Sequence, residues 1–163
     1  WVPKLGGKMD IIRGQTNVTW LQSDKPGVYR GQWAMFCGVD HAWMALQVVA
    51  QSPQEFRAWQ EHQISPTPAP TTASARAGQR AFQASCAVCH AIRGSDAAGI
   101  LGPDLTHLMS RRTLAAGILP NTPGNLAGWI ANPQRIKPGA KMPDGLVSGA
   151  QLTDVMAYLK TLK

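Results

Sequence analysis

The chain has 163 residues, 44% of them hydrophobic and 15% charged, and carries a formal net charge of +7. This length suits one ordinary domain or two small ones. The apolar runs are too short to cross a membrane, and no basic run with interleaved aromatic residues marks a nucleic-acid-binding protein. Beyond residue 63 there are ten basic and four acidic side chains, so six of the seven net charges lie there. That excess fits either the steering of an acidic partner or an ordinary soluble basic surface.

The first part of the chain favours β structure. Four short β-branched or aromatic runs separated by turn residues predict strands: residues 8–12, 17–21, 27–31 and 45–50. A helix is predicted over residues 53–60, with Ser52 as its N-cap and Pro53 in its first position. Four strands are too few for a closed barrel or a full sandwich, so the first part is predicted to be an incomplete β domain.

Residues 63–75 are typical of a linker. They contain three prolines at alternate positions and no charged side chain. Such a segment is expected to be extended and semi-rigid rather than packed. The predicted organisation is therefore a β domain over residues 1–62, a linker over 63–75 and a second domain over 76–163.

The second domain favours helices. They are predicted over residues 75–87, from a cap at Thr122 onward, and from Ser148 to the C-terminal end. Ser148 and Gln151 have the spacing of a capping box. The last helix repeats apolar residues at three- and four-residue intervals, namely Leu152, Val155, Met156 and Leu159.

Cys86-Ala87-Val88-Cys89-His90 is the pattern that attaches haem covalently. Each cysteine sulfur can add to one haem vinyl group, and His90 then supplies an axial nitrogen to the iron. A zinc site would need a second pair of ligands, which the chain lacks. Covalent haem attachment takes place outside the cytoplasm, which indicates an extracytoplasmic protein. The long loops rich in glycine and proline fit a chain that wraps a large planar cofactor.

The second axial ligand is predicted to be Met142. It lies in a loop next to Pro143, where a thioether can reach an iron atom without the constraint of a helix. Met156 belongs to the apolar face of the last helix, and Met109 lies in an apolar stretch, so core packing is predicted for both. For His107 we expect a helix-surface or hydrogen-bonded position.

With these motifs, residues 76–163 resemble a class I cytochrome c domain, and more narrowly the one fused to subunit II of caa-type cytochrome c oxidases. The resemblance implies that Gly78 and Phe82 of the first helix pack across Tyr158 of the last. Gly102-Pro103-Asp104-Leu105 is similar to the family's GPxL turn, in which the Pro103 carbonyl receives the N–H of His90 and orients its ring.

The same resemblance implies contacts to the haem propionates. Trp129, Arg111 and Arg112 match positions near these groups in the family. Surface exposure is the alternative for the two arginines.

Residues 31–44 resemble the loop that binds the dinuclear copper centre in oxidase subunit II, and residues 1–8 and 26–32 resemble its flanking strands. The family loop has two cysteines, a histidine and a methionine. Here the second cysteine, the histidine and the methionine are present as Cys37, His41 and Met44.

Two positions of this copper loop depart from the family pattern. Trp33 stands where the family has its first cysteine, and Met35 stands where it usually has glutamate. The family's other histidine ligand would precede Trp1. One bridging thiolate cannot hold two coppers and an indole has no lone pair for a metal, so we expect no dinuclear centre.

Cysteine, histidine and methionine are three of the four ligands of a mononuclear copper site. For this chain we expect weak copper binding or none. The alternative is that Cys37 is a buried thiol and His41 a hydrogen-bonded loop residue. An incomplete cupredoxin-like Greek-key β domain exposes strand edges, so we also expect a dimer, strand exchange or a partly disordered first part.

The resemblance implies electron transfer through haem c within subunit II of a haem-copper terminal oxidase in a respiratory chain. The implied partners are other oxidase subunits and a soluble cytochrome or cupredoxin donor. The implied location is the periplasmic face of a bacterial inner membrane, with a membrane anchor upstream. The chain itself would break no substrate bond. Two alternatives remain open: a haem protein that binds peroxide, nitric oxide or carbon monoxide once Met142 dissociates, and a copper-binding or copper-delivery protein that carries a haem domain.

Overall fold

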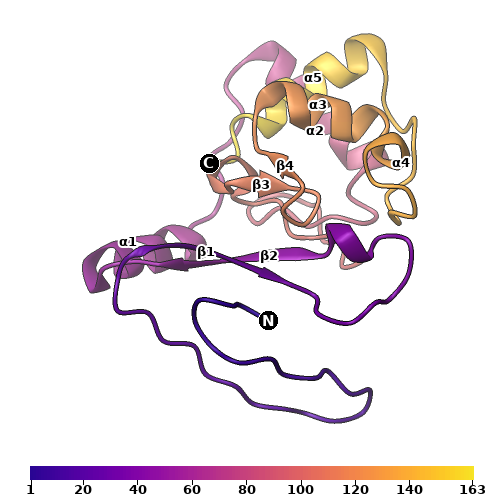
Figure 1. Cartoon of the computed structure of the whole chain (residues 1–163). Coiled ribbons are helices and arrows are strands. Elements are labelled where there is room, and N and C mark those ends of the chain that lie inside the picture. The colour runs from indigo at the N-terminus through magenta and orange to yellow at the C-terminus, as the bar shows by residue number, and fades with distance from the viewer.

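A computed structural model describes all 163 residues, with a β part and a helical part (Figure 1). The β part contains β1 (Gly27–Gln32), a short 3-10 helix η1 (His41–Trp43), β2 (Ala45–Ala50) and α1 (Pro53–Ile64). The helical part contains the following elements: α2 (Ala73–Ser85), η2 (Leu108–Ser110), β3 (Thr113–Leu114), β4 (Leu119–Pro120), α3 (Pro123–Ala131), α4 (Pro133–Ile136) and α5 (Gly149–Leu159). No helix is both long enough and apolar enough to span a bilayer.

The β part is one antiparallel pair of strands. β1 pairs with β2 in a register that joins Gly27 to Ala50 and Gln32 to Ala45. These two strands confirm the predictions over 27–31 and 45–50. The other two strand predictions, residues 8–12 and 17–21, are wrong, because these residues lie in loops.

The missing strands have a physical reason. A β-branched run becomes a strand only when a neighbouring chain accepts its backbone hydrogen bonds. The two runs are joined by a side-chain bond from Asn17 Nδ2 to the Asp10 carbonyl, and no backbone bond links them. Their apolar side chains stay in solvent: Val18 is 85% exposed and Trp20 77%. Trp1 meets the end of β1, where Gln32 N–H donates to the Trp1 carbonyl over 2.9 Å. A two-stranded sheet of this kind does not form the predicted Greek key.

α1 begins as predicted and is longer than predicted. The Ser52 hydroxyl accepts from Glu55 N–H, and the Glu55 carboxylate accepts from Ser52 N–H, which completes a capping box. Phe56 and Trp59 stack on its surface, with ring centroids 5.6 Å apart. The helix continues to Ile64, so it takes the first two residues of the predicted linker.

The extended connection therefore covers residues 65–72, since α2 already starts at Ala73. It is also bonded to the helical part. Thr67 donates from its backbone N–H and its hydroxyl to the Arg93 carbonyl, over 3.3 and 2.9 Å. The Arg93 guanidinium donates to the Gln63 carbonyl over 2.7 Å. These bonds hold the end of α1 against the loop that follows His90.

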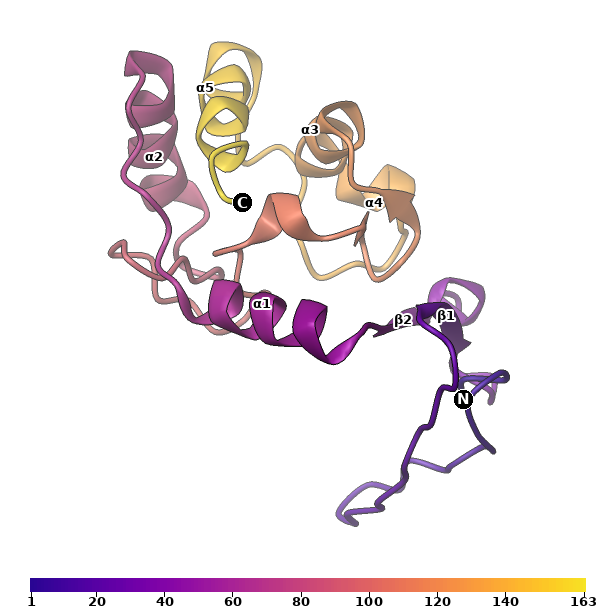
Figure 2. The same ribbon diagram turned by 90° about the vertical axis from the view of Figure 1, so that its left-hand side faces the viewer.

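α2 and α5 lie side by side and form the frame of the helical part (Figure 2). They approach closely at Gly78, where a Cβ would overlap the Asp154 carbonyl and lie 3.0 Å from Tyr158 Cβ. The Phe82 and Tyr158 rings meet edge to face, 5.8 Å between centroids and 65° between planes. Ser74 Oγ donates to Asp154 Oδ1 over 2.5 Å beside this contact. The packing implied for Gly78, Phe82 and Tyr158 is thus present.

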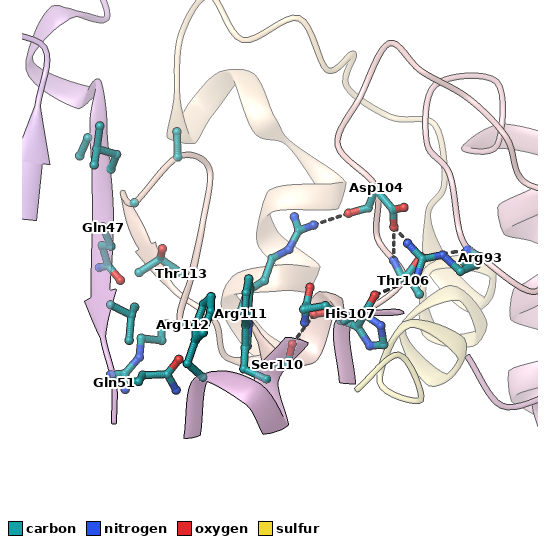
Figure 3. Close-up of a pocket in the computed structure, with 18 residues that line it drawn as sticks. Gln47, Gln51, Arg93, Asp104, Thr106, His107, Ser110, Arg111, Arg112 and Thr113 are labelled. Atoms are coloured by element: carbon teal, nitrogen blue, oxygen red, sulfur yellow. Dashed lines mark hydrogen bonds between the residues drawn. The ribbon is translucent and has the colours of Figure 1, made fainter. Parts of the chain in front are cut away.

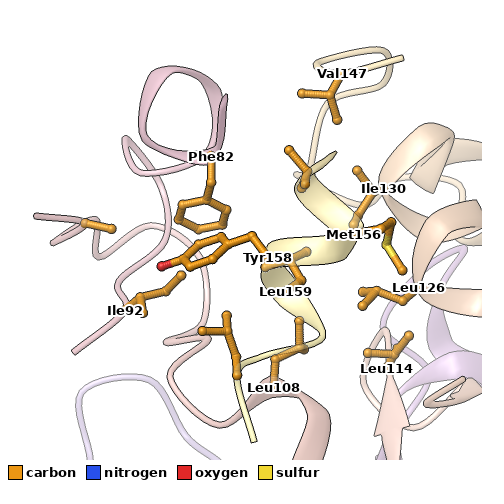
Figure 4. Close-up of a cluster of buried hydrophobic side chains, with 13 residues drawn as sticks. Phe82, Ile92, Leu108, Leu114, Leu126, Ile130, Val147, Met156, Tyr158 and Leu159 are labelled. Atoms are coloured by element: carbon orange, nitrogen blue, oxygen red, sulfur yellow. The ribbon is translucent and has the colours of Figure 1, made fainter. Parts of the chain in front are cut away.

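A single apolar cluster joins these helices to α3 and the loops (Figure 4). Its members are all buried: Phe82, Ile92, Ala97, Leu108, Leu114, Leu126, Ile130, Val147, Val155, Met156, Tyr158, Leu159 and Leu162. Met156 is part of this core, as its helical spacing predicted. Met109 packs against the cluster from η2.

The helix ends match the sequence only in part. α3 starts where expected, and the Thr122 hydroxyl accepts from Asn125 N–H over 3.2 Å. The predicted capping box at Ser148 is wrong, because its side chain makes no capping bond. Gly149 has φ of +55°, so the chain enters α5 through a left-handed residue, which departs from the helical backbone that a capping box requires. α2 ends at Ser85, two residues earlier than predicted.

Candidate functional site

The two cysteines of the haem motif lie in a tight turn at the end of α2. Cys86 is the C-cap, and its carbonyl accepts from the N–H groups of both Cys89 and His90 over 3.0 Å. Both cysteines are free and half-buried. Burial, helped by the neighbouring Cys89, raises the pKa of the Cys86 thiol to about 11. At neutral pH this thiol is therefore protonated, unlike the thiolates that bind zinc or attack disulfides.

His90 is oriented by the turn that follows. Its Nδ1 lies 2.8 Å from the Pro103 carbonyl oxygen. Because a carbonyl only accepts, Nδ1 carries the proton and Nε2 keeps its lone pair for a metal. Gly102 lies against the ring, since a Cβ there would be 2.5 Å from His90 Cε1. Gly102 N–H also donates to the Cys89 carbonyl over 2.7 Å, which ties the two turns together.

Met142 lies in the loop between α4 and α5. This methionine loop, residues 137–143, turns at Gly139, whose φ of +87° a side chain would disfavour. The Gln134 side chain contacts its backbone, and Gln134 Nε2 donates to the Met142 carbonyl over 2.9 Å. Met142 itself is half-buried and packs against the apolar cluster.

His107 has another role. It is only 6% exposed, and its Nδ1 lies 2.7 Å from the Lys163 carbonyl. Its Nε2 is buried without a hydrogen-bond partner, and its ring packs on His62 of α1 at 4.3 Å between centroids. Of the two positions expected for His107, the hydrogen-bonded one is therefore correct, and the helix surface is not.

These residues fit a c-type haem. Cys86, Leu105 and Met142 all pack against the same apolar cluster. The attachment cysteine Cys86 and the predicted iron ligand Met142 therefore lie along one apolar surface. Near His90, Ile100 and Leu101 hold their side chains in solvent, at 92% and 81% exposure, as large apolar surfaces that a planar ligand can cover. Two thiols that can add to the vinyl groups, with one imidazole lone pair and one thioether for the iron, are the groups that such a haem requires.

The two arginines implied to contact the propionates line a cavity of about 900 Å³ between β2, α1 and the loop after Pro103 (Figure 3). Arg111 donates to the Asp104 carbonyl. Burial lowers the pKa of Arg111, and the Asp104 charge opposes this shift. Arg112 lines the part of the cavity near Gln51. Trp129 is half-buried in α3. Propionate contacts by these three residues stay a prediction.

The three remaining copper-loop ligands lie close together. Cys37 Sγ is 3.0 Å from Met44 Sδ and 3.8 Å from His41 Nδ1. Cys37 is exposed, so the alternative of a buried thiol is wrong. Trp33 Nε1 is buried without a partner and can only donate. The loop offers one cysteine sulfur, and the Trp33 indole stands where the family has its first cysteine. It therefore does not fit a centre in which two sulfurs bridge two coppers.

The copper loop approaches the methionine loop. A Cβ on Gly139 would lie 3.5 Å from Asp40 Oδ2, and Asp40 Oδ1 is buried without a hydrogen-bond partner. In both views η1, the short helix that starts after Asp40, lies next to the loop that leads out of α4 (Figures 1 and 2). The sequence carried no signal for this approach, which depends on how distant segments meet, or for the bonds of Gln134, which depend on the direction of its side chain.

Comparison with known proteins assigns the β part and the helical part to two different families. The family profile described as cytochrome c matches residues 75–163. The profile described as the periplasmic domain of cytochrome c oxidase subunit II matches residues 1–51.

Three curated relatives match over the full length of this chain, and each is named cytochrome c oxidase subunit 2. The protein of Alkalihalophilus pseudofirmus is 39% identical over 165 residues, which are 47% of its own length. Those of Bacillus sp. strain PS3 and Bacillus subtilis are 34% and 29% identical, each over 49% of its length. The chain thus spans about half the length of these relatives. By residues 75–163 it belongs to the cytochrome c family, joined to a segment homologous to cytochrome c oxidase subunit II.

Proposed function

We propose that the chain is the electron-transferring segment of a cytochrome c oxidase subunit II, with one haem c attached at Cys86 and Cys89. His90 and Met142 would hold its iron. The observation that carries this proposal is the hydrogen bond from His90 Nδ1 to the Pro103 carbonyl, which leaves Nε2 as an oriented ligand beside two free thiols. The full-length match to proteins named cytochrome c oxidase subunit 2 supports the same function.

When bound, the haem supplies one-electron redox chemistry. The role of the protein is to orient the ligand side chains and to exclude water from the site. The Pro103 carbonyl keeps the proton on His90 Nδ1 and makes the imidazole more electron-rich, which favours the oxidised iron. The Met142 thioether opposes this and raises the reduction potential. The apolar cluster beside Cys86 and Met142 excludes water from that side of the site, and would therefore limit the solvent reorganisation that accompanies electron transfer.

The partners follow from the charge and the family. The helical part carries most of the net positive charge, which fits an acidic soluble donor, a cytochrome or a cupredoxin, that docks by long-range attraction. Other oxidase subunits are the partners of the β part, since residues 1–51 match the subunit II domain. That domain is described as periplasmic, which places the proposed function outside the cytoplasm.

For the copper loop we propose that the dinuclear centre does not form. Cys37 Sγ lies within 3.8 Å of both His41 Nδ1 and Met44 Sδ, so these three groups offer a site for at most one soft cation such as Cu(I). Metal analysis of the protein, loaded with copper and then dialysed, should give one copper or fewer per chain. Cys37→Ser should remove any copper that is retained, whereas Met35→Leu, a change in the same loop outside the three-ligand group, should not. Two coppers per chain with the absorption of a mixed-valence centre would contradict this proposal.

The haem proposal is tested by spectroscopy on protein produced with haem attachment in the bacterial periplasm. The reduced protein should have a c-type spectrum that carbon monoxide does not change, and Met142→Ala should make the iron bind the gas. The matched control is Met109→Leu, which should remain closed to it. Carbon monoxide binding by the unmodified protein would favour the alternative of a gas-reactive haem protein.

A further inference from the structure

The Gln134 side chain is the main support of the methionine loop. Its Nε2 donates to the Ala140 carbonyl over 2.5 Å and to the Met142 carbonyl over 2.9 Å. Its Oε1 accepts from Gly139 N–H over 3.1 Å. The amide thus uses both of its hydrogens and its oxygen on three residues of one loop.

Gln134 is itself firmly placed. It is the second residue of α4, directly after Pro133, one of the most deeply buried side chains of the protein. The Asn132 side chain caps this turn by accepting from Arg135 N–H over 2.9 Å. Gln134 N–H donates to Asp144 Oδ1 over 3.1 Å, so the segment after the loop is tied to the same residue.

The methionine loop has little other support. Within residues 137–143 the backbone forms two bonds: Lys137 N–H donates to the Pro133 carbonyl over 2.8 Å at the start of the loop, and Ala140 N–H donates to the Lys137 carbonyl over 3.1 Å. Pro138 and Pro143 have no N–H to donate, and Gly139 adopts a left-handed conformation. Without the Gln134 amide, the Ala140 and Met142 carbonyls and the Gly139 N–H would need water as a partner, which would draw the loop outward.

We propose that Gln134 is a positioning residue that holds the Met142 thioether on the haem iron. The proposal rests on the function proposed above, in which Met142 is an axial ligand. It deepens that function, since it assigns the stability of the sulfur–iron bond to an amide eight residues away in the sequence. Gln134 does not touch the iron or any reacting atom.

The test compares Gln134→Leu and Gln134→Glu with the unmodified protein, with haem attached in each. Leucine has a similar volume and removes all three bonds. Glutamate keeps the acceptor for Gly139 N–H and loses both donors, so its carboxylate oxygen faces the Ala140 and Met142 carbonyls. Gln151→Leu is the matched control, because Gln151 is exposed on α5 and its side chain makes no hydrogen bond.

Two measurements report on the sulfur–iron bond. The first is the weak red absorption band that ferric haem shows only with a methionine ligand. The second is the rate at which imidazole displaces Met142 from the oxidised iron. Loss of the two donated bonds should weaken or abolish the band and speed the displacement about tenfold or more, where tenfold corresponds to about 1.4 kcal/mol. The α2–α5 frame should persist, as seen by far-ultraviolet circular dichroism, and the control should match the unmodified protein.

The outcomes separate this proposal from the proposed function. A full red band and displacement within twofold of the unmodified protein in both variants would overturn the role of Gln134 and leave the haem function standing. Absence of the band in the unmodified protein would overturn Met142 ligation and the Gln134 role with it. If Gln134→Leu does not fold, Gln134→Glu decides, because it preserves size and one of the three bonds.

Discussion

The contact of α2 with α5 makes Gly78→Ala a demanding test of the fold. A Cβ at this position meets the backbone carbonyl of Asp154, which no change of rotamer can move, and Tyr158 Cβ at 3.0 Å. The two helices must separate, which costs about 1–3 kcal/mol for overpacking. Separation also weakens the Ser74–Asp154 hydrogen bond, by about 1 kcal/mol, and the Phe82–Tyr158 ring contact, by about 0.5–1.5 kcal/mol.

Alanine recovers about 1 kcal/mol through its higher helix propensity. We therefore expect Gly78→Ala to lower the free energy of unfolding by about 1.5–4.5 kcal/mol. For a part of this size the melting temperature should fall by about 4–8 °C for each kcal/mol. Urea and thermal unfolding of the haem-loaded protein, followed by circular dichroism, measure both quantities.

Gly124→Ala is the control for this substitution. Gly124 lies in the first turn of α3, and a Cβ there has no atom within 4 Å. Its replacement should leave the stability unchanged or slightly raised. If Gly78→Ala were as stable as Gly124→Ala, the close helix crossing would be wrong.

The other predictions concern the helix ends, one carboxylate and the β part. Thr122→Ala should lower the free energy of unfolding in urea by about 1 kcal/mol, because it removes the α3 cap. Ser148→Ala removes no capping bond and should cost less than about half of that. Equal losses in the two variants would show that Ser148 does form the capping box. Burial acts to raise the pKa of Asp104, but the Thr106 hydrogen bonds and the charges of Arg93 and Arg111 outweigh it and lower this pKa. The stability that Asp104 contributes is therefore fully present above its unfolded pKa of about 3.9 and is lost as pH falls through the lower folded value. Asp104→Asn should lower stability at pH 7 and change it little at the acid end of that window, and a deficit independent of pH would contradict this. In hydrogen exchange, backbone amides of β1 and β2 should exchange faster than those of α2 and α5, or else the chain should be dimeric by light scattering. A monomer whose β part is well protected from exchange would contradict both expectations.

Local chemistry made the helical part predictable. Its main features depend on residues that are close together in the sequence. These are the haem motif from Cys86 to His90, the turn at Gly102, and the cap at Thr122, which acts over three residues. The β part was less predictable. Residues 8–12 and 17–21 have the composition of strands, but a strand is defined by its partner, and composition does not say whether a partner is present.

Some features of the site lie beyond what a pattern can show. The amide of Gln134 has the same spacing to Met142 whether it points toward the methionine loop or into solvent. Ser148 and Gln151 have the spacing of a capping box, and the left-handed Gly149 between them prevents it. In each case the deciding factor is a backbone direction set by tertiary packing rather than by the residue type.

The approach of Asp40 to Gly139 has a mechanical consequence. The buried Oδ1 of Asp40 has no hydrogen-bond partner, and an unmet acceptor of this kind costs about 1–3 kcal/mol. At the opposite end of the same boundary, the bonds among Thr67, Arg93 and Gln63 are all satisfied. The β part and the helical part are thus joined firmly at Arg93 and weakly at Asp40. A rotation that separates the two parts should open first beside the methionine loop, which carries the proposed iron ligand Met142.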